Sequence, residues 1–191
     1  MARKKEFDLT EKLAKAKDLF WEKGYHGTSM QDLVDTMQLN PGSIYGTFGD
    51  KHTLFMEGLK MYSSQTLADY RAAAARCQTP FNAVKVIIQK AISRSFIEDK
   101  ACMVVRSTYE LAGTDRKAHN LLKKQTVELA ELLEDLLKLA QEKNEISRDK
   151  DPRMLAFFII SSFAGFWQMQ LLFKDKKMQQ QLASLLTDSL R

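Results

Sequence analysis

The sequence is poor in residues that interrupt helices and in residues that build covalent or metal-bound frameworks. It has 3 Pro and 8 Gly in 191 residues, which favours a mostly helical chain with few irregular loops. Its two cysteines, Cys77 and Cys102, are too few for a disulfide framework. The three histidines, His26, His52 and His119, lack metal-ligand spacing, and no nucleophile elbow or phosphate-cradling glycine loop occurs. These absences argue against an enzyme and give no reason to expect a metal or another cofactor.

Long uninterrupted apolar runs and a strong local charge excess are also missing. Met-Ala-Arg-Lys-Lys-Glu opens the chain without a following apolar run, so we expect no signal peptide. The most apolar stretch, 154–173, contains Ser161 and Ser162, which favours a core helix over a membrane span. We therefore expect a cytoplasmic protein without a membrane partner. The net charge of +5 permits an anionic partner, but residues 1–60 carry nine Lys or Arg and nine Asp or Glu.

Apolar residues recur at helical spacing along the chain, and no strand alternation or hairpin signal is convincing. The first helix is predicted at about 9–23 and ends at Gly24; the second begins at Thr28 or Ser29 and reaches about Met37. Thr28-x-x-Gln31 fits a capping box for it. Further helices are predicted at about 41–48, from Asp50 to about Tyr62, and at about 62–77, 80–98, 101–112, 115–143, 151–173 and 175–189.

The predicted fold class is all-α, with about nine helices. Residues 1–50 form an N-terminal three-helix domain with a helix-turn-helix. Residues 51–191 are predicted to form a larger C-terminal helical domain.

The segment 40–48 is unusual for a core helix. In Asn40-Pro41-Gly42-Ser43-Ile44-Tyr45-Gly46-Thr47-Phe48, only Ile44 and Phe48 clearly point inward. A helix that lies in a DNA groove needs small residues for close approach, together with donors and acceptors, whereas a core helix buries more apolar area. Since a short connection joins this helix to the one before it, the pair fits a helix-turn-helix.

Groups suited to phosphate surround this pair. Thr28 and Ser29 offer hydroxyls and amides at a helix start, and Lys51 and His52 lie at the start of the next helix, where the helix dipole also favours an anion. The Tyr45 hydroxyl can reach an oxygen of the DNA backbone. These residues indicate that the protein contacts the DNA phosphates through particular side chains and amides at defined positions. Binding would then not depend on a net positive charge of this segment.

The N-terminal pattern resembles the signature of the TetR/AcrR family of transcriptional regulators. It reads Gly24-Tyr25-x-x-Thr28-Ser29-x-x-x-Leu33, then Asn40-x-Gly42-Ser43-Ile44-Tyr45-x-x-Phe48-x-x-Lys51-x-x-Leu54-Phe55. The resemblance implies a homodimer that binds a palindromic double-stranded DNA operator, with repression as the family's usual mode. It also implies a C-terminal domain that binds a small-molecule effector and thereby releases DNA.

The resemblance also implies roles for individual residues. The phosphate contacts would be Thr28, Tyr45 and Lys51, and the groove-facing set would be Asn40, Gly42, Ser43 and Thr47. The chain departs from the family at Gly46 and Thr47, where a histidine or another large residue is frequent. The helix also lacks Arg and Lys, so bidentate reading of guanine from it is unavailable. We expect thymine-methyl contacts, Gln31 or DNA shape to contribute more of the specificity.

Two long helices suit a subunit interface. The segment 115–143 is amphipathic, and 151–173 is apolar almost all round, so the latter must be covered on several sides. The resemblance implies that both pair with their mates in a four-helix dimer interface. The alternative is that 151–173 is an internal core helix.

An effector pocket is expected between the helices of the C-terminal domain. Its candidate lining residues are Arg94, Phe96, Cys102, Arg106, Tyr109, Phe163, Trp167 and Gln168. For each aromatic residue, ordinary core packing is the competing interpretation. Arg106 has apolar neighbours and needs a partner, either Glu110 or an anionic ligand. The aromatic and Met-rich content favours an apolar or aromatic effector.

Two alternatives stay open. Cys102 can act as a sensor of oxidants or electrophiles, with Lys100 and Arg106 nearby to lower its pKa, or it can be a buried small hydrophobe. The chain can also be a non-regulatory helical binding module in which 28–51 is only structural.

Overall fold

The computed structural model describes residues 8–97 and 102–191, apart from the side chains of 95–97. Within these ranges the chain forms nine α-helices and no strand, so the all-α prediction is confirmed. The helices are α1 (Leu9–Lys23), α2 (Met30–Met37), α3 (Pro41–Phe48), α4 (Lys51–Ala74), α5 (Pro80–Ile97), α6 (Met103–Leu111), α7 (Arg116–Glu142), α8 (Pro152–Phe173) and α9 (Lys176–Ser189).

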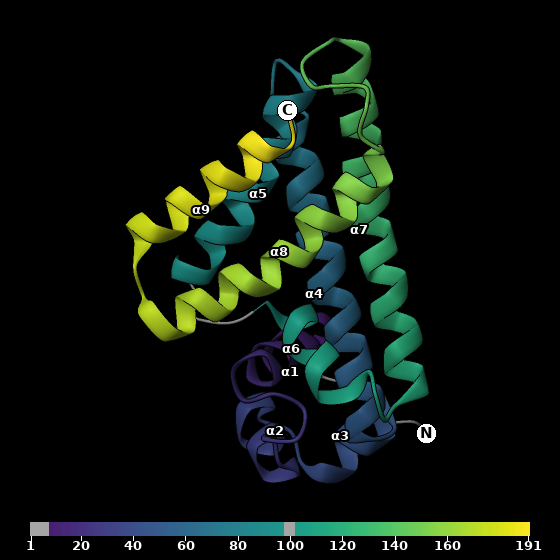
Figure 1. Ribbon diagram of the computed structural model, residues 1–191. Helices are drawn as coiled ribbons and strands as arrows, with labels where there is room; N and C mark the ends of the chain where they lie inside the picture. Colours follow the sequence, from purple (N-terminus) through teal and green to yellow (C-terminus); the bar gives the residue numbers. More distant parts are fainter. Residues whose placement is uncertain (1–7, 98–101) are drawn as a thin grey trace.

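The helices gather at two ends of the molecule. Helices α1 to α3, which we call the head, lie at the lower end in Figure 1, and α5, α7, α8 and α9 lie above them. We call α5 to α9 the body. Helix α4 begins beside α3 and runs upward into the body, so it packs against α1 in its first half and against α5 further along.

Helix α4 corrects one prediction. The sequence pattern suggested one helix to about Tyr62 and another at 62–77, but the structure has one continuous helix, Lys51–Ala74. The helix contains no Pro, and its one glycine, Gly58, lies one turn before Tyr62, buried against Lys17 of α1. The hydroxyls of Ser63 and Thr66 donate to Leu59 O (3.0 Å) and Tyr62 O (2.9 Å), one turn back, so these polar residues stay inside the helix. The head and the body are therefore joined by a rigid element.

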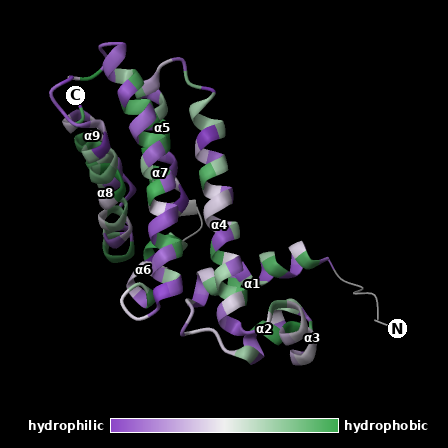
Figure 2. Ribbon diagram, turned by 90° about the vertical axis from the view of Figure 1, so that its right-hand side faces the viewer, coloured by the Kyte–Doolittle hydropathy of each residue, from purple (hydrophilic) through white to green (hydrophobic). Residues whose placement is uncertain are grey.

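Two clusters of buried residues form the core. The body cluster joins α5, α7, α8 and α9 around residues such as Ile87, Leu133 and Ile159. Residues far apart in sequence make up the head cluster, which includes Phe20, Leu33, Ile44, Leu54, Phe55, Met103, Leu111, Ala118 and Leu122. Hydrophobic and hydrophilic residues alternate along α4, α5 and α7, as expected for helices with one buried side (Figure 2). The head cluster therefore buries residues of α6 and of the start of α7.

Helix α8 is more exposed than a core helix. It is the one helix in 8–97 and 102–191 that is long and apolar enough to cross a membrane, with 22% of its most apolar window buried. Large apolar side chains remain in contact with solvent along it: Met154, Phe158, Leu171, Leu172 and Phe173. A single chain therefore leaves much of the apolar surface of α8 uncovered.

Candidate nucleic-acid interface

Helix α3 presents a mostly small and polar surface. Ile44 is fully buried and anchors the helix in the head, whereas Pro41, Gly42, Tyr45 and Gly46 are exposed. An added Cβ at Gly46 would meet nothing within 4 Å. The exposed side of α3 thus consists largely of small residues that leave its backbone accessible.

The start of α3 is held by its own cap. Asn40 Oδ1 accepts a hydrogen bond from Ser43 N (2.8 Å), and Pro41 occupies the first turn. Thr47 is half-buried near the other end of the helix, which Gly49 closes. The side-chain amide nitrogen of Asn40 has no role in the cap, so it remains a donor at the exposed start of α3.

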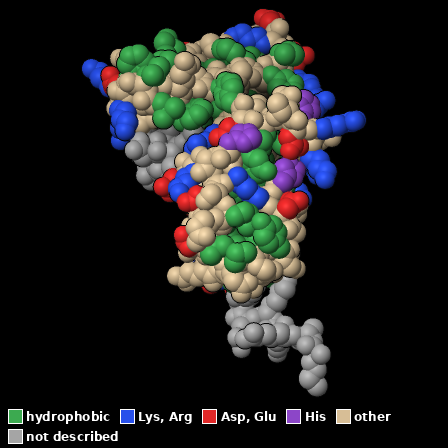
Figure 3. Space-filling view, turned by 90° about the horizontal axis from the view of Figure 1, so that it is seen from below, with side chains coloured by type: hydrophobic (Ala, Val, Ile, Leu, Met, Phe, Trp, Pro, Cys, Tyr) green, Lys and Arg blue, Asp and Glu red, His purple; other side chains and the backbone are tan. Residues whose placement is uncertain are grey.

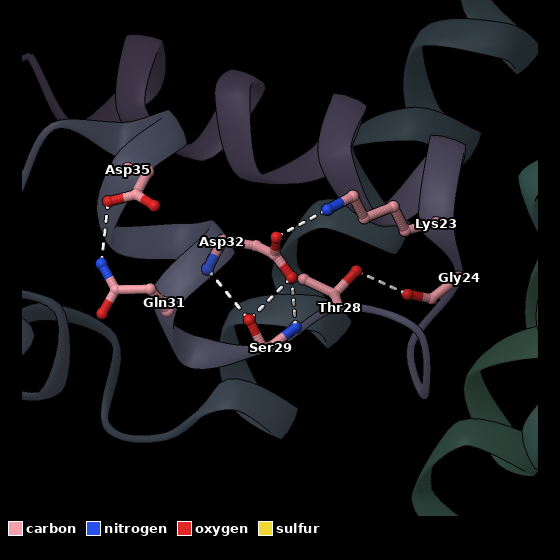
Figure 4. Close-up of polar contacts among 7 residues, drawn as sticks. All are labelled: Lys23, Gly24, Thr28, Ser29, Gln31, Asp32 and Asp35. Atoms are coloured by element: carbon pink, nitrogen blue, oxygen red, sulfur yellow. Dashed lines mark hydrogen bonds and ion pairs between the residues drawn. The ribbon is translucent and has the colours of Figure 1, made fainter.

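The start of α2 differs from the prediction (Figure 4). The capping box joins Ser29 and Asp32, and not Thr28 and Gln31: Ser29 Oγ accepts from Asp32 N (3.0 Å), and Asp32 Oδ2 accepts from Ser29 N (2.8 Å). Because Asp32 is the third residue of the helix after Ser29, its carboxylate can reach back to the cap. Lys23 Nζ lies 2.6 Å from the other carboxylate oxygen.

These contacts set the charge of Asp32. The hydrogen bonds from Lys23 and Ser29 hold the pKa of its carboxyl well below the ordinary value. A charged carboxylate therefore sits at the start of α2, where Thr28 and Ser29 were expected to receive phosphate. Thr28 is buried, and its hydroxyl donates to Gly24 O at 2.6 Å. Ser29 stays exposed, with its hydroxyl bonded to Asp32 (2.7 Å).

Gln31 lies on the exposed side of α2. Its Nε2 donates to Asp35 Oδ1 at 2.8 Å, so the Gln31 amide is held beside a carboxylate (Figure 4). This pairing orients the amide and leaves its oxygen as an exposed acceptor.

Lys51 and His52 are the first residues of α4. Asp50 precedes them and caps the helix, since its carboxylate accepts a hydrogen bond from Thr53 N (2.6 Å). The Lys51 ammonium lies 4.5 Å from the centre of the Tyr25 ring, and partial burial lowers its pKa. His52 Nε2 is 2.5 Å from Asp115 Oδ2. The hydrogen bond from Ala118 N, together with the His52 contact, lowers the pKa of Asp115. His52 is thus directed to the body.

The charges of this end of the molecule are mixed. Figure 3 looks onto it from below, and Lys and Arg side chains are scattered among acidic and apolar ones without forming one basic surface. This agrees with the equal numbers of basic and acidic residues in 1–60.

A contact that the sequence did not predict joins α6 to the head. Arg106 donates to Glu22 O (2.7 Å), Lys23 O (2.8 Å) and Trp21 O (3.4 Å) at the end of α1, and its Nε donates to Glu110 Oε1 at 2.9 Å. The other Glu110 oxygen accepts from Tyr25 N (2.7 Å). We call the contact of Arg106 and Glu110 with residues 21–25 the head–body clamp. The last carbonyls of a helix have no partner within the helix and carry partial negative charge. The Arg106 guanidinium supplies both the hydrogen-bond donors and the positive charge that these carbonyls favour.

The clamp requires a glycine at position 24. Gly24 has φ 80° and ψ 173°, a conformation that is essentially restricted to glycine. A Cβ there would overlap Glu110 Oε1 and lie 2.9 Å from Arg106 Nε. Of the two partners that the sequence left open for Arg106, the structure has Glu110.

A cavity of about 90 Å³ lies where α4, α6, α7 and α8 meet. Of the predicted effector residues, Cys102 and Phe163 line it. Arg94 is next to it, since its guanidinium donates to the lining residue Thr66 (2.8 Å) and lies 5.2 Å from the centre of the Tyr62 ring. Sequence reasoning missed Tyr62 and Gln125, because their helical positions are those of ordinary core residues.

Other predicted effector residues are placed differently. Arg106 belongs to the clamp, Tyr109 is 76% exposed, and Gln168 is exposed. Trp167 is half-buried, and its indole nitrogen is buried without a hydrogen-bond partner among the described residues. The side chain of Phe96 lies outside the described residues.

Comparison with known proteins places the chain in a family. The model of the bacterial regulatory proteins of the tetR family matches residues 13–57, and the model of the tetracyclin repressor-like C-terminal domain matches residues 80–186. The HTH-type transcriptional regulator YezE of Bacillus subtilis is 30% identical, over 85% of this chain and 85% of the relative. The chain belongs to the TetR family. It is therefore a DNA-binding transcriptional regulator, and the resemblance seen in 24–55 is confirmed.

Further relatives are consistent with this membership. The transcriptional repressor ComR of Escherichia coli is 27% identical over 82% of this chain and 76% of the relative. The solved structure of a cysteine-substituted CifR, a TetR family regulator complexed with 26-base-pair operator DNA, has a TM-score of 0.87 at 21% identity and full coverage of both chains. The reduced form of E. coli NemR has a TM-score of 0.83 at 15% identity and 94% coverage of both. These two structures share the fold of this TetR-family chain.

Proposed function

We propose that this TetR-family regulator is a homodimeric repressor that binds a palindromic operator and is released by a small, largely apolar or aromatic effector. In this proposal residues 1–50 bind DNA and residues 51–191 bind the effector and the second subunit. The observation that carries the proposal is the exposed side of α3, where small residues leave the backbone open and Tyr45 is 48% exposed.

The proposed DNA contacts fall into two groups. Asn40, Gly42, Ser43 and Thr47 face the groove, with Gln31 from α2, whereas Tyr45 and Lys51 contact phosphates. Ser29 joins them only if its hydroxyl leaves Asp32. Thr28 joins the phosphate contacts only if its hydroxyl leaves Gly24 O, and His52 only if it leaves Asp115. Phosphate contacts fix the register, and the groove-facing residues determine the sequence that is read.

Selection of bound sequences from random DNA tests the operator proposal. We expect an inverted repeat with half-site centres about 34–36 Å apart, or a multiple of that spacing, because a dimer reaches successive major-groove faces. Binding should weaken steeply with salt. Enrichment of no repeated half-site would contradict the palindromic operator, and failure to bind any DNA selectively would favour a helical module without regulatory function.

The homodimer is supported by the exposed apolar side of α8. Leu172, Phe173 and Met154 are at least 60% exposed, and α7 adds Leu139 at 45%. Large contiguous apolar surfaces are rare on monomers, so a second copy seated on α7 and α8 would remove them from water. Light scattering should give a mass of twice 21.9 kDa. A single-chain mass at micromolar concentration would contradict the dimer.

A second candidate is a repressor that senses oxidants or electrophiles through Cys102. It is favoured by the position of Cys102, which lines the same cavity as Tyr62. Arg106, one of the two cations expected beside it, is engaged by Glu110 and the α1 carbonyls, and Lys100 lies outside the described residues. Mass spectrometry after mild peroxide, paired with a DNA-binding assay, decides between the two. An unmodified Cys102 with unchanged DNA binding would rule out this candidate.

A further inference from the structure

The cavity between α4, α6, α7 and α8 contains one polar group whose bonding is incomplete. Gln125 of α7 is 9% exposed and lines the cavity. Its Nε2 donates to Leu59 O at 3.4 Å, while its Oε1 is buried without a hydrogen-bond partner among the described residues. Because a carbonyl oxygen accepts and never donates, the contact with Leu59 O fixes which end of the amide is left over.

Three hydroxyls around the cavity donate their protons to backbone carbonyls one turn back. Thr66 donates to Tyr62 O and Thr126 to Leu122 O, both at 2.9 Å, and Ser63 donates to Leu59 O. Burial and the nearby Cys102 side chain raise the pKa of the Tyr62 hydroxyl well above its ordinary value. The cavity wall therefore offers an occupant an acceptor, Gln125 Oε1, surrounded by apolar side chains such as Ile160 and Phe163.

Charged groups of both signs lie around the cavity. Glu128 lines it, with its side chain 41% exposed and 3.8 Å from Lys124, and the Arg94 guanidinium donates to the lining residue Thr66 at 2.8 Å. The group that disfavours a carboxylate ligand is therefore Gln125 Oε1, because the carboxylate would bring its own lone pairs against an acceptor. A pure hydrocarbon would leave Gln125 Oε1 buried and unpaired, which costs free energy.

The size of the cavity favours a small occupant. Its volume of about 90 Å³ is below the roughly 150 Å³ of an apolar cavity that holds benzene, and the cavity is partly open on one side. A molecule can therefore place its polar end at Gln125 and extend its apolar part toward the opening.

We propose that the effector is a small neutral molecule, apolar apart from a hydrogen-bond donor that Gln125 Oε1 accepts. This inference rests on the proposed function, in which the body binds an effector, and it specifies the chemistry of that effector. The residues that select the effector are Gln125, which accepts from the donor, and Ile160 and Phe163, which contact the apolar part.

Calorimetric titration of the full-length protein with four simple probes tests this. The probes are phenol, which carries a donor; toluene, of the same shape without one; anisole, which offers only an acceptor; and benzoate, an anion. We expect phenol to bind about 3- to 10-fold more tightly than toluene or anisole, the gain from one hydrogen bond, and benzoate to bind most weakly. Equal affinities, tighter binding of benzoate, or no binding of any probe, as when the cavity holds only water, would overturn the proposal.

A substitution of Gln125 tests whether this residue causes the preference for phenol. In Gln125→Met, which keeps the length of the side chain and removes the acceptor, the preference for phenol over toluene should vanish while toluene binding is kept or improved. The control Gln181→Met, at an exposed glutamine of α9, should keep the preference. A preference that persists in Gln125→Met would overturn the proposal. Should Gln125→Met fail to fold, as judged by circular dichroism, the four-probe comparison on the unmodified protein still decides.

A parallel assay separates this inference from the proposed function. Release of operator DNA by phenol is followed by fluorescence anisotropy. Gln125-dependent binding of phenol without release of DNA would support the chemistry of the cavity and contradict its role as the effector site. Release of DNA by phenol that is unaffected in Gln125→Met would support regulation by an effector and contradict this binding mode.

Discussion

Gly24→Ala should destabilise the protein strongly, because Gly24 combines a glycine-only backbone with a close approach. Its φ of 80° and ψ of 173° cost a non-glycine residue about 1–3 kcal/mol. The added Cβ would also push Glu110 and Arg106 out of the head–body clamp. Solvent partly screens this contact, because the side chains of Glu110 and Arg106 are 21% and 31% exposed. Loss of its charged hydrogen bonds should therefore cost about 1–3 kcal/mol. The sum is a loss of about 2–6 kcal/mol in the free energy of unfolding.

Urea and thermal unfolding followed by circular dichroism measure this loss. For a chain of this size, we expect Tm to fall by roughly 5–20 °C. The matched control is Gly46→Ala in α3, where a Cβ meets nothing within 4 Å. That change should be neutral or stabilise by about 0.5–1 kcal/mol, because alanine suits a helix interior better than glycine.

The double variant Gly24→Ala with Glu110→Ala distinguishes the cost of the Gly24 backbone conformation from the cost of losing the clamp hydrogen bonds. It should be less destabilised than the sum of the single variants, since both disrupt the same contact. If Gly24→Ala unfolds at the same temperature as Gly46→Ala, or if the effects of Gly24→Ala and Glu110→Ala add without coupling, the head–body clamp does not stabilise the protein.

Further predictions concern DNA, pH and assembly. Lys51→Ala should weaken binding to all DNA sequences alike and reduce the salt slope by about 1, unlike Lys60→Ala; an unchanged slope would contradict a phosphate contact. The contacts of Asp32 lower its folded-state pKa, so their stabilisation is complete above about pH 4 and is lost as the pH falls through that pKa. Urea midpoints of Asp32→Asn should thus fall less on acidification than those of the unmodified protein; parallel curves would contradict this. Phe158→Asp, on the exposed side of α8, should shift the mass in light scattering toward one chain of 21.9 kDa, and an intact dimer would place the interface elsewhere.

The starts and ends of helices could be predicted where the signal is local. Asp8, Asn40 and Asp50 cap α1, α3 and α4 through amides two or three residues away, and Gly24 and Gly49 end α1 and α3. The capping box predicted for Thr28 and Gln31 was wrong at α2, where the sequence left Thr28 and Ser29 open as the start. Only the folded head decides between them, because it buries Thr28 and turns its hydroxyl to Gly24.

The interface was partly predictable for the same reason. Small residues along α3 are enough to indicate an open face, and the placement of Lys51 at the start of α4 is likewise a local property. The orientation of His52 was not predictable, since its partner Asp115 lies 63 residues away in the sequence.

The sequence by itself thus determined the helical class, the helix-turn-helix and the TetR resemblance, because capping, turns and apolar spacing depend on residues within one or two turns. Tertiary structure alone decided the head–body clamp, in which Tyr25 and Glu110 meet across 85 residues, and the cavity, in which Gln125 reaches Leu59 across 66. Such contacts depend on how whole helices pack. The apolar neighbours of Arg106 indicated that it needs a partner, but not that it reaches the end of α1, and Gln125 does not differ in its local pattern from any other residue of an amphipathic helix.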